Sequence, residues 1–192
     1  MTVLILGLVL FLGVHSVRIF ADDWRTGMRT RLGENAFKGV YSVLSLAGLV
    51  LIVWGYGLAR QQPVLLWVPP VWTRHVAALL TIPAFVMLAA SQVPGNSIKA
   101  RLKHPMVLGV KVWALAHLLS NGMLADVVLF GSFLVWAVLS FRAARGRDRV
   151  SGAVPAPGRM GPTVVAVAGG LLVWAVFAFW AHGFLIGVRP FG

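Results

Sequence analysis

Apolar residues run along this chain in long stretches that alternate with short polar segments. Several of the apolar stretches reach the ~20 residues that a helix needs to cross the ~30 Å hydrocarbon core of a bilayer. None of the polar segments is long enough to form a second domain. The pattern predicts an all-α fold, a single domain over residues 1–192 built as a polytopic bundle of about six transmembrane helices. The expected spans are residues 2–21, 39–59, 71–90, 105–119, 123–141 and 163–188.

The composition agrees with a membrane location. Hydrophobic residues make up 59% of the 192 residues and charged residues 11%, against about 25% charged in ordinary globular domains. The chain contains no cysteine, which excludes disulfides, iron–sulfur clusters and cysteine-ligated zinc. The first apolar stretch has no basic segment before it and no A-x-A site before Asp22. We therefore expect it to stay in place as a span rather than to be removed as a signal peptide.

Charge is distributed unevenly between the polar segments. The chain has 17 basic and 5 acidic residues, and a net charge of +12. Most of the basic residues follow the first, third and fifth spans: Arg25, Arg29, Arg31, Lys38, Lys99, Arg101, Lys103, Arg142, Arg145, Arg147, Arg149 and Arg159. By the positive-inside rule these segments face the cytoplasm and both termini lie outside. The expected partners are the bilayer and its anionic lipids. Nucleic acid is not expected, because no motif of that kind occurs.

Ionisable groups inside the spans are costly in a bilayer, and they point to function. At a rise of ~1.5 Å per residue, His15 lies about 18 Å from the outer surface and His117 about 18 Å from the inner surface. Both then lie near the midplane of the ~30 Å core. Two neutral imidazoles at one depth could clasp a planar metal cofactor, and haem b with two axial histidines is the candidate. The alternative is that each is a hydrogen-bonded core residue.

Two cations accompany these histidines. Arg18 lies one turn from His15, and Lys111 lies about 9 Å closer to the cytoplasm than His117. Either side chain could pair with haem propionates, although Arg18 could instead extend its guanidinium to the membrane surface.

Another group of polar residues, His75, Asp126 and His182, falls near the outer boundary. These could form a second polar cluster in which Asp126 orients a histidine. A zinc site is conceivable there, but three ligands on three helices without an H-x-x-x-H pair form a weak pattern.

Three stretches of this sequence resemble the NnrU family of bacterial membrane proteins, and together they cover nearly the whole chain. They are HPMVLGVKVWALAHLLSNGMLADVVLFGSFLVWAV, the final HGFLIGVRPFG, and HSVRIF followed by MRTRLGENAFKGVYSVLSL. The resemblance implies an integral protein of the bacterial inner membrane that supports denitrification. A respiratory or redox protein is the partner that such a role implies.

The NnrU family is in turn similar to the plant 15-cis-zeta-carotene isomerase, a membrane haem b protein with histidine axial ligands. Its first ligand lies in a His-Ser motif, which here is His15-Ser16. Its second lies in a W-x-L-A-H motif thirteen residues after His-Pro, which here is His117, thirteen after His104. The isomerase has a cysteine inside that motif, proposed to exchange with histidine, where this chain has Ala114. A ligand-exchange mechanism is therefore not expected here.

Three functions are compatible with these observations. The first is a haem b protein that supports nitrogen-oxide respiration as a redox or gas-responsive factor. The second is a haem-dependent cis–trans isomerase of a polyene, which needs an apolar slot beside an iron position that can open. The third is a non-enzymatic scaffold or small-solute channel, in which the polar residues serve only helix packing.

The predicted orientation can be tested with reporters fused after Gly192. Because the basic segments are expected in the cytoplasm, alkaline phosphatase fused there should be active and green fluorescent protein should be dark. A bright fluorescent fusion with inactive phosphatase would contradict the prediction that both termini lie outside.

Overall fold

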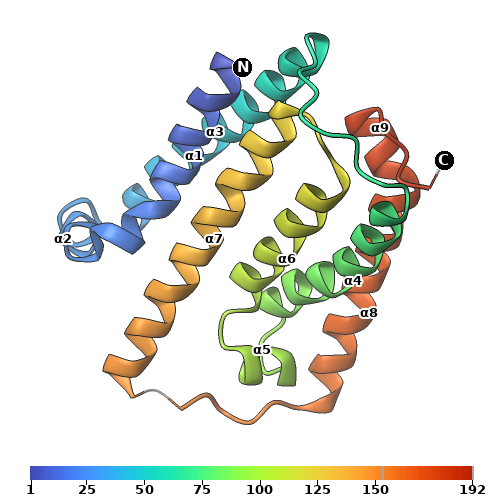
Figure 1. Ribbon diagram of the computed structural model, residues 1–192. Helices are drawn as coiled ribbons and strands as arrows, with labels where there is room; N and C mark the ends of the chain where they lie inside the picture. The colour runs from blue at the N-terminus through green and yellow to red at the C-terminus, as the bar shows by residue number, and fades with distance from the viewer. Residues whose placement is uncertain (153, 192) are drawn as a thin grey trace.

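The computed structural model describes residues 1–152 and 154–191, and within them the fold is a bundle of helices (Figure 1). Five helical segments are long and apolar enough to cross a membrane, so the chain is an integral membrane protein of the all-α class, as predicted. They are α1 (Thr2–Phe20), α3 (Glu34–Gln61), α4 (Trp72–Gln92), α7 (Leu124–Ser151), and α8 (Met160–Val176) with its continuation η1 (Phe177–Ala181) and α9 (His182–Ile186).

A sixth apolar helix, α6 (Pro105–Ser120), lies inside the bundle but has only 16 residues. At ~1.5 Å per residue it is about 24 Å long, shorter than the ~30 Å core. It begins with a proline at its first position, where the missing N–H costs nothing. Two further helices, α2 (Asp22–Leu32) and α5 (Ser97–Leu102), are short and lie in the polar segments.

The long helices pack side by side in an order that differs from their order in the chain. α3 packs on α1, α1 on α7, α7 on α6, α6 on α4, and α4 on α8. The helices that carry His15 and His117, α1 and α6, therefore lie on either side of α7 (Figure 1). Both chain ends lie toward one end of the bundle, opposite α5 and the connection from α7 to α8. The number of passes and the orientation in the membrane stay predictions.

Some segments that were expected to be loops are helical, because a helix can continue beyond the apolar stretch that predicts a span. The segment 22–38 was expected to be a loop, but it contains α2 and the start of α3. The fifth span was expected to end at residue 141, and α7 continues to Ser151. Residues 142–151 are rich in alanine and arginine, which favour helix, and the helix stops at Gly152 in the left-handed conformation. Residues 153 and 192 lie outside the described residues.

The C-terminal extension of α7, residues 142–151, stabilises the turn between α5 and α6 through Asp148. Asp148 accepts a hydrogen bond from the Nε2 of His104 at 3.0 Å, and it lies 4.0 Å from Lys103 and 3.9 Å from Arg145. His104 and Lys103 form the turn between α5 and α6, where Lys103 has a φ of +61°. One carboxylate thus holds this turn against α7.

The pairing of α1 with α3 depends on glycines that bring the two backbones together. A Cβ on Gly55 of α3 would collide with the backbone of Leu4, and one on Gly48 would collide with the backbone of Phe11. Small residues at such contacts are the usual means of close helix association in membranes.

Gly55→Val should therefore destabilise the protein by at least the ~1–3 kcal/mol typical of overpacking, because the obstacle is backbone and cannot rotate away. Gly57→Val is the matched control, since Gly57 lies on the same helix with nothing within 4 Å of its Cβ position. Thermal unfolding in detergent should show a clear loss of melting temperature for the first variant alone. Equal melting temperatures would refute the close contact.

Candidate functional site

His15 lies on α1, and a hydrogen bond to the helix itself determines the tautomer of its neutral imidazole. Its Nδ1 lies 2.7 Å from the carbonyl oxygen of Phe11, one turn earlier. A carbonyl can only accept, so Nδ1 carries the proton and Nε2 keeps its lone pair. The imidazole stacks on the Phe11 ring at 4.2 Å and meets the edges of Tyr41 and Trp136 at 5.2 and 6.1 Å between centroids.

His117 repeats this arrangement on α6. Its Nδ1 lies 2.9 Å from the carbonyl oxygen of Trp113, again one turn earlier. The ring stacks on Phe130 at 4.5 Å and contacts Trp113 at 5.1 Å between centroids. Both histidines therefore present Nε2, with Nδ1–H bonded to a backbone carbonyl, which is a usual state of a metal-ligating histidine.

Among the described residues, no direct ring contact joins the two imidazoles. A chain of aromatic rings links them: Phe11 lies 5.9 Å from Phe133, and Phe133 lies 5.6 Å from Trp113, between centroids. The donor chemistry of the two histidines fits haem iron. Phe11 packs on His15 and Trp113 contacts His117, so a haem plane bound by both histidines would require these rings to shift.

The two predicted propionate partners have no competing carboxylate. Within the described residues, neither the Arg18 guanidinium nor the Lys111 ammonium takes part in an ion pair or a side-chain hydrogen bond. Arg18 is exposed at the end of α1, and its backbone carbonyl accepts from Arg147 of α7 at 3.1 Å. Lys111 is half-buried on α6. Both cations are therefore free to bind an anion.

The outer residues are arranged differently from the predicted cluster. Asp126 is 5% exposed and accepts hydrogen bonds from the Tyr56 hydroxyl at 2.6 Å and from the Met123 N–H at 3.2 Å. His182 bonds through Nδ1 to the Val188 carbonyl, and His75 is exposed. Across residues 1–152 and 154–191 no group of three or more His, Asp or Glu side chains could hold a metal ion. The structure thus forms no zinc site of this kind.

Asp126 and His182 nevertheless both lie close enough to His117 to interact with it electrostatically. The buried carboxylate is held by Tyr56, one of only two tyrosines in the chain. Sequence reasoning missed this partner, although a tyrosine within a span is a signal that could have found it, because a buried hydroxyl needs a hydrogen-bond acceptor.

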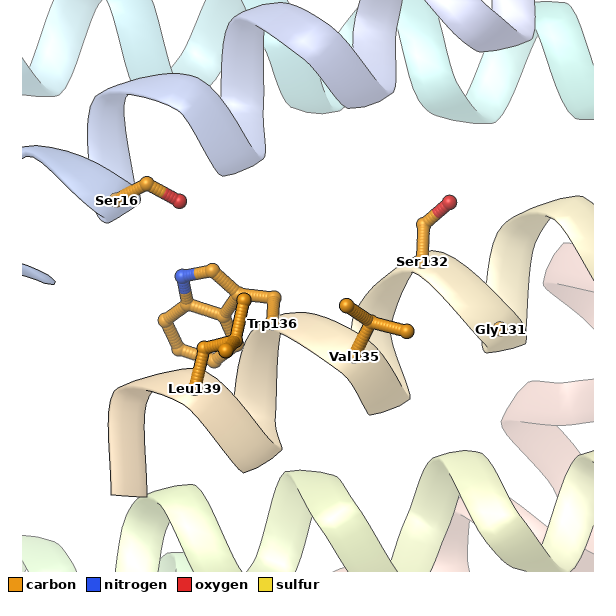
Figure 2. Close-up of a pocket in the computed structure, with 6 residues that line it drawn as sticks. All are labelled: Ser16, Gly131, Ser132, Val135, Trp136 and Leu139. Carbon is orange, nitrogen blue, oxygen red and sulfur yellow. The ribbon is translucent and has the colours of Figure 1, made fainter. Parts of the chain in front are cut away.

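An open cavity of about 460 Å³ lies beside His15, between α1 and α7 (Figure 2). Its lining residues are Ser16, Gly131, Ser132, Val135, Trp136 and Leu139. The Trp136 Nε1 is buried and has no hydrogen-bond partner among the described residues. This cavity could not be predicted from the sequence, because its walls come from two helices more than 100 residues apart in the chain.

Tyr56→Phe should reduce stability by about 1–3 kcal/mol, because it leaves one oxygen of a buried carboxylate without its donor. Tyr41→Phe is the matched control, since the Tyr41 hydroxyl has no hydrogen bond among the described residues and lies on the same helix. Thermal unfolding in detergent measures both. A Tyr56→Phe variant as stable as wild type would mean that this hydrogen bond does not hold Asp126.

Comparison with known families adds one finding. The family described as NnrU protein matches residues 3–190, nearly the whole chain. The comparisons with curated proteins and with solved structures each found no match.

Proposed function

The chain belongs to the NnrU family, and on that premise we propose that it is a haem b-binding protein of the bacterial inner membrane. In this role it supports denitrification as a redox or gas-responsive factor, together with a respiratory or redox partner protein. Haem binding is the primary part of this proposal, because the proposed role in denitrification depends on the haem.

The proposal rests on the hydrogen-bonding pattern that His15 and His117 have in common. Both lie in apolar helices, and both donate Nδ1–H to the carbonyl one turn earlier. Each thereby keeps an Nε2 lone pair that no group in the described residues uses. An unused polar atom in an apolar environment is unfavourable, and iron would satisfy both of them.

Each residue would have a definite task in such a site. His15 and His117 would hold the iron from α1 and α6, with their orientation set by the Phe11 and Trp113 carbonyls. Arg18 and Lys111 would pair with the propionates, since neither has another anionic partner. Bound haem would supply one-electron transfer, and gas could bind to it only if His15 or His117 gave up its place.

Helix α6, which carries His117, does not support the alternative of a polyene isomerase. The residue in the position of the isomerase's cysteine is Ala114, which is fully buried on α6. A methyl group there cannot exchange with histidine at a metal. The scaffold alternative remains, and it predicts that no cofactor is present.

An absorption spectrum of detergent-purified protein from haem-supplemented cells tests the proposal. Dithionite reduction should produce sharp α and β bands in the wild type. His15→Ala and His117→Ala should each lose or strongly alter these bands, because each removes one axial ligand. His75→Ala is the matched control, since His75 is exposed and should leave the spectrum unchanged.

A featureless wild-type spectrum would refute haem binding and favour the scaffold. If the bands are found, nitrite reductase activity in a denitrifying strain that carries only the His15→Ala variant tests the respiratory role. Activity equal to that with the wild type would separate haem binding from denitrification.

A further inference from the structure

Helix α2 lies between two membrane-spanning helices and turns across them. It begins at Asp22, directly after the break at Ala21 that ends α1, and Gly33, with a φ of +79°, separates it from α3. Figure 1 shows α2 almost along its axis, whereas α1 and α3 are seen from the side. Among the described residues α2 packs only on α1 and α3. Because both neighbours are long enough to cross the membrane, α2 lies near the surface where α1 leaves and α3 enters.

One face of α2 is apolar and is left uncovered by the rest of the described chain. Trp24, Met28 and Leu32 follow one another at four-residue intervals, so they form a single stripe. Trp24 is 58% exposed and Leu32 is 47% exposed, and no residue of α2 is buried. Large apolar side chains are unfavourable in water, so this stripe needs an apolar contact that the described residues do not supply.

Arginines border the apolar stripe on both sides. At ~100° per residue, Arg31 lies about 60° from Met28 in one direction and Arg25 lies about 60° from it in the other. Arg29 lies beyond Arg25 on the same side. The Arg31 guanidinium takes part in no ion pair or hydrogen bond among the described residues. Guanidiniums beside an apolar stripe are suited to reach the headgroups while the stripe enters the lipid.

The face opposite the stripe is polar and carries the acidic residues of the helix. Asp22 and Asp23 lie on this side, together with Thr26 and Thr30. Both threonine hydroxyls donate to the carbonyl one turn earlier, at 2.9 and 3.1 Å. An acidic protein partner would account for the arginines but not for the stripe, and a neutral apolar partner would account only for the stripe. The surface of an anionic bilayer accounts for both features.

We propose that α2 lies in the membrane surface as an interfacial helix and binds anionic phospholipid. Trp24, Met28 and Leu32 enter the upper part of the acyl chains, and the arginines of α2 pair with the phosphates. The charge pattern of the sequence predicts only which side of the membrane this segment faces, whereas the helix and its stripe add that it is inserted. The proposal does not rest on haem, because no residue of α2 belongs to the proposed haem site.

Spin labelling of the full chain in lipid nanodiscs tests this proposal. Because the chain contains no cysteine, Met28→Cys and Thr30→Cys each provide a single labelling site. Thr30 is the matched control, since it is exposed on the polar face of the same helix. The readout compares collisions of the nitroxide with oxygen, which concentrates in lipid, and with a neutral nickel chelate, which stays in water.

The discs contain equimolar phosphatidylcholine and phosphatidylglycerol. The oxygen-to-nickel accessibility ratio should be at least about threefold higher for the label at residue 28 than for the label at residue 30, because only the stripe enters the acyl chains. In discs of phosphatidylcholine alone the ratio at residue 28 should fall, because the surface no longer carries the net negative charge that attracts the arginines.

Arg31→Gln in the Met28→Cys background tests the part of the charge. It should reduce the difference between the two lipid compositions, since Arg31 has no other anionic partner. Arg101→Gln is the matched control, because it removes the same charge from an exposed residue of α5 and should leave the label at residue 28 unchanged. Gel filtration of each variant confirms that it is folded.

Three results would overturn the proposal. Equal access of the nickel chelate to residues 28 and 30 would place the stripe in water. Poor access of both reagents to residue 28 would show that protein covers the stripe, as in contact with a second copy of the chain. Equal depth with and without phosphatidylglycerol would show that anionic lipid is not the ligand. None of these measurements requires haem, so this proposal and the haem proposal fail or hold independently.

Discussion

The absence of water from the bilayer core is the constraint on which this structure depends. Polar groups inside the spans must find partners within the protein. His15 and His117 meet this requirement with their own helices, each through a carbonyl one turn earlier, and Asp126 meets it through Tyr56. Against this background the unused groups stand out. Among the described residues, the two Nε2 atoms, the Trp136 N–H and the Ser45 hydroxyl are polar groups without a hydrogen-bond partner.

The central helix α7 organises these groups. It packs between α1 and α6, separates the two histidines, and supplies aromatic rings to both of them. It also carries a carboxylate near each end. Asp126 is bonded to α3 through Tyr56, and Asp148 is bonded to His104 at the start of α6. A change in α7 would therefore act on both histidines and on both ends of the bundle.

The candidate site was only partly predictable. The depth argument selected His15 and His117 because rise per residue is a local property of a helix. The same argument could not predict the ring contacts that join Phe11, Phe133 and Trp113, since these come from three helices. Nor could it pair Asp126 with Tyr56, 70 residues away. The outer cluster was inferred from equal depth alone, and among the described residues it forms no group that could hold a metal ion.

By itself, the sequence determined the class of the protein, an all-α integral membrane protein with several long apolar helices. Apolar length and the distribution of basic residues are read directly from consecutive residues, and they follow from the energy of moving side chains into lipid. Tertiary structure alone decided that α7 lies between α1 and α6, that α7 extends to Ser151, and that a cavity opens beside His15. These features depend on which helix faces meet, and in a membrane almost every face is apolar, so hydrophobic pattern does not distinguish the packed face from the lipid-facing one.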